Sequence, residues 1–172
     1  MASGTAQAIF LCTPSYFTAQ LSSSFPTRHP MHQLIYMSQA TQPFSDDDLV
    51  ALLRQSRQWN EEQNITGVLL YGNKQFVQVL EADVPALCDL YGKLLRDPRH
   101  QTVTRLAYGP IAVRRFAQWS MGFHTASATQ LAEIQGYANP RQLKLRDPSQ
   151  SPADGPLFQM IERFAHSSTN GL

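Results

Sequence analysis

The 172-residue sequence has few charges of either sign and no long hydrophobic run. Charged residues make up 16% of the chain and sum to a formal net charge of +1, without a basic run, so nucleic acid is not an expected partner. No apolar stretch reaches the roughly 20 residues that a helix needs to cross a bilayer, so we expect no membrane span. The two cysteines, Cys12 and Cys88, lie far apart and fit neither a disulfide framework nor a metal site. This cysteine usage favours a reducing, cytoplasmic location.

The sequence also lacks the common motifs of nucleotide binding and catalysis. It contains no phosphate-binding loop, no Rossmann glycine fingerprint and no nucleophile elbow. Its five histidines have no partners at the spacing of a metal site; they are His29, His32, His100, His124 and His166. We therefore expect neither an enzyme nor a metalloprotein. Composition and periodicity by themselves indicate a soluble α+β domain with polar groups in its core.

A hairpin is the most regular pattern in the chain. Two apolar arms between Ile65 and Ala82 meet at Gly72-Asn73-Lys74, where Gly and Asn accept the positive φ of a tight turn. The first arm, residues 68–71, is apolar on both faces. This predicts a central strand that is covered on both sides.

The second arm of the hairpin alternates, and one of its residues is unexpected. Gln78 shares a strand face with Phe76 and Leu80, while Val77 and Val79 face the other way. An unpaired amide buried on that face would cost on the order of 1–3 kcal/mol, so we expect Gln78 to have a dedicated partner. From this stretch alone, the simpler interpretation is a glutamine bonded to neighbouring backbone.

Another strand is predicted before the hairpin, at His32–Ser38. Leu34 and Tyr36 share one of its faces, and Ile35 and Met37 share the other. The simplest interpretation of Tyr36 is a core residue whose hydroxyl is hydrogen-bonded.

A helix is predicted to start at Ser45, which is a good N-cap. The three aspartates that follow complement the helix dipole, so a catalytic interpretation of them has little support. The apolar stripe of this helix continues into Ser56 and Asn60. Together with Gln78, these residues bring three polar groups toward the interior.

A second helix is predicted from Asp83-Val84-Pro85 to Pro98, with a capping acid and a first-turn proline. The polar segment Asp97-Pro98-Arg99-His100 follows, and by itself it is typical of a solvated turn. Two more strands are predicted, Val103–Ala112 with an interruption at Gly109-Pro110, and Gln118–Phe123.

The Gln118–Phe123 pattern places Trp119, Met121 and Phe123 on one face, which by itself is typical of a plain core. Amphipathic helices are expected after Ser127, where they would cover the second face of the sheet.

The order of elements predicts a ferredoxin-like α+β sandwich with a mixed sheet of about five strands. Two helices are expected on one face of the sheet and the C-terminal helices on the other. Residues 1–30 are rich in Ser, Thr, Ala and Pro, and we interpret them as a mobile leader. Residues 31–124 would form the main domain, and residues 125–172 a helical extension.

Five short motifs extend this prediction. They are Leu-Ile-Tyr-x-Ser at 34–38, Asn60 followed by Ile-Thr-Gly at 65–67, Phe-x-Gln-x-Leu-Glu at 76–81, Asp-Pro-Arg-His at 97–100, and Phe-x-x-Trp-Ser-Met at 116–121. In this order and spacing, the set resembles the BLUF family of blue-light sensors that use FAD. The resemblance covers about Met31 to Phe123. It implies a ferredoxin-like sheet with the flavin ring held between two helices.

The resemblance implies that seven residues bind the flavin: Tyr36, Ser56, Asn60, Gln78, Asp97, Arg99 and His100. Tyr36 is similar to the tyrosine that donates an electron and a proton to the excited flavin, and Gln78 to the glutamine whose hydrogen bonds then rearrange. The segment 97–100 corresponds to the polar group near the ribityl and phosphate end. Trp119 and Met121 match the pair whose placement is thought to change with light.

Two residues depart from the family pattern. Ala82 stands where glycine is common after Leu-Glu, which puts only local turn geometry in doubt. Trp59 stands where Asn or His is frequent beside Asn60, and this suggests the loss of one polar contact to the flavin.

The function implied by the resemblance is that of a blue-light photoreceptor with noncovalent FAD. Its signal would pass through the last strand and the C-terminal helices to a protein partner or a homo-oligomer. Within these 172 residues we expect no cyclase or diesterase domain. Two alternatives stay open at this point: a flavin-dependent or acylphosphatase-like enzyme, and a light-independent module that binds a small molecule.

Overall fold

The computed structural model describes residues 30–137 and 151–166. Five strands form one mixed sheet: β1 (Met31–Ala40), β2 (Thr66–Gly72), β3 (Gln75–Asp83), β4 (His100–Pro110) and β5 (Gly122–Thr125). Their order across the sheet is β4-β1-β3-β2-β5, and only the β2–β5 pair is parallel. Residues 1–29 of the predicted leader lie outside the described residues, as do residues 138–150 and 167–172 of the predicted extension.

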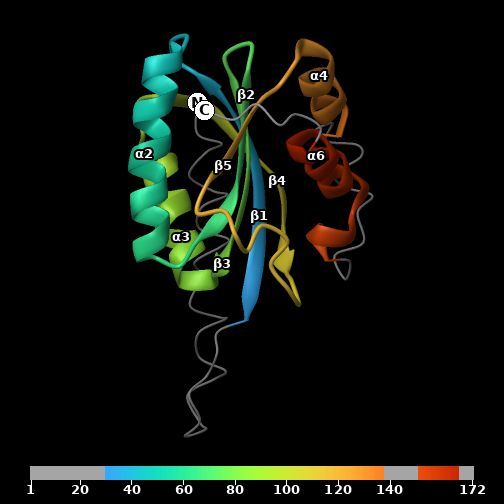
Figure 1. Cartoon of the computed structure of the whole chain (residues 1–172). Helices are drawn as coiled ribbons and strands as arrows, with labels where there is room; N and C mark the ends of the chain where they lie inside the picture. The colour runs from blue at the N-terminus through green and yellow to red at the C-terminus, as the bar shows by residue number, and fades with distance from the viewer. Residues whose placement is uncertain (1–29, 138–150, 167–172) are drawn as a thin grey trace, which may run out of the picture.

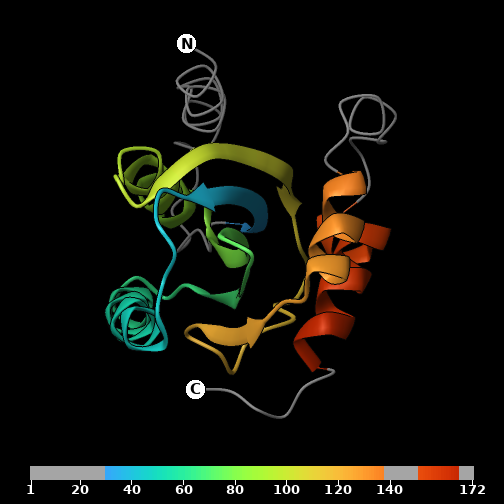
Figure 2. The same ribbon diagram turned by 90° about the horizontal axis from the view of Figure 1, so that it is seen from above.

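Helices cover both faces of the sheet. Helices α2 (Asp46–Glu62) and α3 (Val84–Leu94) lie on one face, and α4 (Ala128–Tyr137) and α6 (Pro156–His166) lie on the other (Figures 1 and 2). A short 3-10 turn, η2 (Pro152–Asp154), precedes α6. The predicted ferredoxin-like α+β architecture is confirmed. No helix among the described residues has both the length and the hydropathy to cross a membrane.

The β2–β3 hairpin turns as predicted, with one difference. Asn73 and Lys74 are the two loop residues, and their φ angles of 45° and 59° are those of a primed hairpin turn. Gly72 does not take a positive φ. Glycine is needed there because a Cβ would lie 2.0 Å from the carbonyl oxygen of Ala126, where the chain leaves β5.

Both predicted helix starts are confirmed. The Ser45 side chain caps α2 by accepting from the backbone N–H of Asp48, and the Asp48 carboxylate accepts from the Ser45 backbone in return. Asp83 caps α3 by accepting from the N–H of Ala86. Helix α3 ends at Leu94, ahead of the predicted stop at Pro98.

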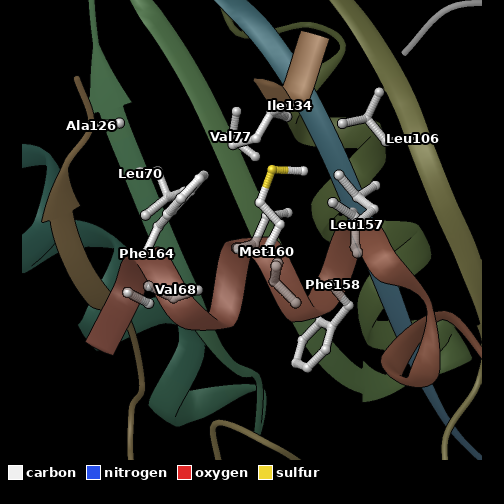
Figure 3. Close-up of a cluster of buried hydrophobic side chains, with 14 of the residues drawn as sticks. Val68, Leu70, Val77, Leu106, Ala126, Ile134, Leu157, Phe158, Met160 and Phe164 are labelled. Carbon is white, nitrogen blue, oxygen red and sulfur yellow. The ribbon is translucent and has the colours of Figure 1, made fainter. Parts of the chain in front are cut away.

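The alternation along β1 and β3 divides the buried residues into two cores. The core under α2 and α3 contains Leu34, Tyr36, Phe76 and Leu80. The core under α4 and α6 contains residues of the opposite strand faces together with residues of both C-terminal helices. Ten of its members are labelled in Figure 3: Val68, Leu70, Val77, Leu106, Ala126, Ile134, Leu157, Phe158, Met160 and Phe164. The expectation that the C-terminal helices cover the second face is therefore confirmed.

The last two strands differ from their predicted bounds. Strand β4 begins at His100 and continues through Gly109 to Pro110. Its irregularities lie earlier than predicted, where its register against β1 shifts between Ile35 and Tyr36 and between Met37 and Gln39. Strand β5 begins only at Gly122, so residues 111–121 form an irregular connection between β4 and β5, called here the β4–β5 connection.

This irregular geometry overturns the prediction that Trp119 and Met121 share a face. Met121 is buried in the core under α2 and α3, whereas Trp119 packs against the core under α4 and α6. The physical reason is that strict alternation of side chains holds only for an extended strand, which this segment does not form.

Candidate functional site

A cavity of about 230 Å³ opens between the sheet and helices α2 and α3. Its lining residues are Tyr36, Leu52, Gln55, Ser56, Trp59, Asn60, Leu69, Phe76, Gln78, Leu90, Lys93, Leu94, Asp97, Arg99 and His100. All seven residues that the sequence suggests as flavin ligands are among them. These seven residues come from four separate segments of the sequence and meet at one space.

A chain of hydrogen bonds crosses the wall of this cavity. Tyr36 on β1 and Gln78 on β3 are directly paired, and the tyrosine hydroxyl donates to Gln78 Oε1 over 2.5 Å. Gln78 Nε2 in turn donates to Met121 Sδ at 3.1 Å. The expectation of a dedicated partner for Gln78 is confirmed, whereas the simpler interpretation of a backbone-bonded amide is wrong.

The environment of Tyr36 keeps its hydroxyl protonated. Burial raises the pKa of the Tyr36 phenol well above its ordinary value, and the nearby Tyr91 and Asp97 raise it further. The phenol therefore acts as a hydrogen-bond donor. Its proton is directed at the Gln78 oxygen.

Helix α2 presents Asn60 and its neighbours to the cavity. Asn60 is buried, and its Nδ2 donates to the backbone oxygen of Ser120 at 2.6 Å, while Ser56 lies one turn earlier on the same wall. Trp59 also lines the cavity, and its indole N–H is buried without a hydrogen-bond partner among the described residues. A buried donor without an acceptor is costly, so this N–H is available to an acceptor atom of a ligand.

The segment 97–100 brings charged groups to the cavity wall. Arg99 Nε and Nη2 both bind the Asp97 carboxylate, at 2.9 Å and 2.6 Å. These hydrogen bonds lower the pKa of Asp97 and raise that of Arg99, so both groups stay ionised. His100 Nδ1 lies 2.7 Å from Ser38 Oγ, and burial lowers the pKa of the His100 imidazole. The segment 97–100 is therefore tied into the cavity wall by specific bonds and is not a plain solvated turn.

Two polar lining residues were missed by sequence reasoning. Gln55 lies one helical turn before Trp59, and this spacing could have placed it on the same wall. Lys93 on α3 had no such signal. Its ammonium lies 3.2 Å from the centre of the Trp59 ring, so it joins α3 to α2 across the cavity.

These features suit a flat, amphipathic ligand. The walls are largely apolar, and the amide groups of Gln78 and Asn60 and the Trp59 N–H lie along them. Two cations also line the cavity: Lys93, which pairs with Asp89, and Arg99, which pairs with Asp97. Among the described residues, no group of His, Cys, Asp and Glu side chains could hold a metal ion.

Comparison with known proteins agrees with this description. The sequence model of the BLUF family, described as sensors of blue-light using FAD, matches residues 31–122. The chain is 44% identical over 89 residues to photoactivated adenylate cyclase subunit beta of Euglena longa, which covers 51% of this chain and 10% of the relative. It is 43% identical over 81 residues to subunit alpha of Euglena gracilis, covering 47% of this chain and 8% of the relative. The chain thus spans about a tenth of the length of these relatives.

Solved structures show the same similarity. The dark state of BlrB, a BLUF protein, has 29% identity and a TM-score of 0.57, and the match covers 78% of this chain and 97% of that one. A bacterial light-regulated adenylyl cyclase has 29% identity and a TM-score of 0.54, with 66% of this chain and 34% of that chain covered.

Proposed function

The chain belongs to the BLUF family, sensors of blue light using FAD, and from this premise we propose that it is a photoreceptor that binds FAD noncovalently in the cavity beside Gln78. The observation that carries the proposal is the Tyr36–Gln78–Met121 hydrogen-bond chain in the wall of that cavity. This chain connects a proton donor, an amide that can reorient and a thioether by two consecutive hydrogen bonds. A flavin supplies absorption of blue light and, when excited, a strong electron acceptor.

The lining residues suit the two ends of FAD. Gln78, Asn60 and Trp59 offer donors and acceptors for the edge of a heterocycle, and the apolar walls suit its faces. Arg99 and Lys93 suit the phosphates, because charge-assisted bonds from Arg to phosphate are strong. FAD carries two phosphates, so both of these side chains can have a phosphate partner.

Tyr36 starts the light response as the donor of an electron and a proton. Its phenol is buried, protonated and bonded to Gln78, so Gln78 is the first group to respond when the phenol proton moves. An amide can present either its N–H or its oxygen. Gln78 therefore changes its hydrogen bonds to the ring, and a new donor to a ring carbonyl lowers the excited state more than the ground state. The electron and the proton then return to Tyr36, so no net redox change remains, and the altered hydrogen bonds of Gln78 would give a small red shift in absorption.

The signal leaves the cavity through Met121. A change at the Gln78 amide alters its bond to the Met121 sulfur, and the β4–β5 connection carries this change to Trp119, whose ring lies 5.3 Å from that of His166 in α6. The C-terminal helices then alter how they contact a protein partner or a second copy of the chain.

An enzyme is less well supported. Asp97 is the acid that lines the cavity, and its carboxylate is held by Arg99, so it is poorly placed to transfer protons.

An absorption spectrum tests the proposal. The purified chain, incubated with excess FAD and freed of unbound flavin, is expected to be yellow and to shift reversibly to the red after blue light. Denaturation should release FAD unaltered, because the binding is noncovalent. A chain that stays colourless would overturn the proposal, and a bound flavin that shows no light-induced shift would favour the enzyme alternative.

A further inference from the structure

A buried carboxylate on β3 plays no part in the cavity. Glu81 is three residues after Gln78, faces away from the cavity, and is the one fully buried acid among the residues that the structure describes. Its carboxylate accepts from Gln33 Nε2 at 3.0 Å. It also accepts from the backbone N–H groups of Arg115, at 3.0 and 3.1 Å, and Phe116, at 3.0 Å. The Glu81 carboxylate thus binds the backbone of the β4–β5 connection.

Arg114, the residue before Arg115 and Phe116, is also hydrogen-bonded to β3. Arg114 Nη1 donates to the backbone oxygen of Glu81 and to Thr66 Oγ1, both at 2.9 Å, and Nη2 donates to the backbone oxygen of Asn64 at 2.6 Å. Three consecutive residues, 114–116, are therefore bound to β3 and to the start of β2. Hydrogen bonds with an ionised partner are roughly twice as strong as neutral ones, so this attachment is firm.

The second half of the connection is held from the cavity side. Asn60 Nδ2 binds the backbone oxygen of Ser120, Arg57 Nε binds that of Met121 at 2.9 Å, and Gln78 binds the Met121 sulfur. Asn60 and Gln78 are both lining residues of the cavity. The two halves of the connection are thus held differently. Glu81 and Arg114 hold the first half. The second half is held by Asn60 and Gln78 of the cavity, by Arg57, and by the Gly67 N–H, which donates to the backbone oxygen of Trp119 at 3.0 Å.

The anchored half is also where the connection meets α6. The Phe116 ring stacks on Trp119 at 5.4 Å and lies 5.7 Å from Phe158 of α6. Arg115 Nε pairs with Glu162 of the same helix at 3.3 Å. A movement of the Trp119 ring would therefore be relative to the ring of Phe116, whose backbone N–H is bound by Glu81.

We propose that Glu81 is a positioning residue for signal transfer. It holds residues 114–116 still, so that a displacement that begins at Met121 is confined to residues 117–121 and is delivered by Trp119 to α6. Without this fixed point, the whole connection would move and the displacement would be spread over it. The inference rests on the proposed function only in that Gln78 responds to light.

Hydrogen exchange of the FAD-loaded full chain tests the proposal with the variant Glu81→Gln. The glutamine has nearly the same shape but no charge. One oxygen of Glu81 accepts from both backbone N–H groups, so in the variant these become neutral hydrogen bonds, which are roughly half as strong, and the third bond, from Arg115 to the other oxygen, is lost. In the dark, the amides of Arg115 and Phe116 should exchange at least about tenfold faster than in the wild type. The red shift of the flavin should remain. The light-minus-dark change in protection over residues 156–166 should fall to less than half.

Glu133→Gln is the matched control, because it removes a carboxylate from the exposed face of α4 and should leave all three measurements unchanged. If Glu81→Gln does not fold, Arg114→Gln loosens the same segment from the other side. The bonds from Arg115 and Phe116 to Glu81 remain in that variant, so the measurement is the light-minus-dark change over residues 156–166, which should again fall to less than half. Wild-type exchange at Arg115 and Phe116, or a full light response in α6 despite faster exchange there, would overturn the proposal. Loss of the red shift would also overturn it, by assigning Glu81 to the cavity. A wild-type chain without any red shift would instead reject the proposed function, and the dark exchange rates would still decide whether Glu81 is an anchor.

Discussion

Tyr36 and Gln78 are directly opposite each other on neighbouring antiparallel strands, and the phenol of the first donates to the amide oxygen of the second. Sheet register alone makes this pair. A slip of one residue would place Tyr36 beside Val77 or Val79, whose side chains face the other core. The position of this pair is therefore protected by the burial of both faces of β3.

Replacing the glutamine tests whether this pair generates the light response. Gln78→Ala should still bind flavin, because Asn60 and the apolar walls remain, but it should lose the red shift. Light-minus-dark absorption spectra measure both effects. Gln58→Ala, on the exposed side of α2, is the control and should keep the full shift. A complete and reversible shift in Gln78→Ala would exclude the proposed switch.

Replacing the tyrosine tests the first step. Tyr36→Phe keeps the ring in the core but removes the O–H that binds Gln78. We expect bound flavin with no red shift and with brighter fluorescence, because the nearby electron and proton donor is gone. Tyr137→Phe in α4 should behave like the wild type. A red shift of ordinary size in Tyr36→Phe would mean that another residue is the donor.

Replacing the tryptophan separates signal transfer from photochemistry. Trp119 packs toward α6 and not into the cavity, so Trp119→Ala should keep the red shift. Hydrogen exchange over residues 156–166 should then lose most of its dependence on light. Equal light responses of α6 in the variant and the wild type would show that the signal takes another route.

Removing the guanidinium tests the phosphate end of the cavity. Arg99→Gln should weaken FAD binding by about tenfold or more, since a hydrogen bond to a charged group contributes about 1.5–3 kcal/mol. Riboflavin has no phosphate, so its affinity should be nearly unchanged, and titration calorimetry can compare the two ligands. Arg96→Gln, at an exposed position, is the control. Equal losses for both flavins would place Arg99 away from the phosphates.

The partly buried His100 predicts a pH dependence of stability. Burial lowers the pKa of His100 below its ordinary value of 6.5, and Arg99 lowers it further, although Asp97 acts in the opposite direction. As the pH falls below about 6.5, the unfolded chain takes up a proton at this position before the folded chain does. The free energy of unfolding therefore falls until the lowered pKa is reached.

Denaturant unfolding at pH 7.5 and pH 5 can measure this contribution. His100→Asn should lose less stability than the wild type between these two pH values. The pKa of His124 is also lowered by burial, but His124 is present in both proteins, so the comparison isolates His100. Equal losses would contradict the prediction.

Much of this molecule follows from local sequence patterns. The shared face of Tyr36 with Leu34, and of Gln78 with Phe76, is a consequence of the two-residue period of a strand. The helix starts at Ser45 and Asp83 follow from capping chemistry within four residues. The family motifs identified the seven candidate flavin ligands, and in the structure these residues line one cavity. Their roles toward flavin stay predictions.

Only the tertiary structure decided the course of residues 111–121. This segment has no repeating backbone geometry, so alternation could not predict that Met121 would enter one core and Trp119 the other. Its path is set by bonds from Glu81, Asn60 and other residues far away in the sequence. Strand and helix periods are properties of the local backbone and can be read from neighbouring residues. An irregular connection is held by long-range hydrogen bonds, which exist only once the sheet and helices are in place.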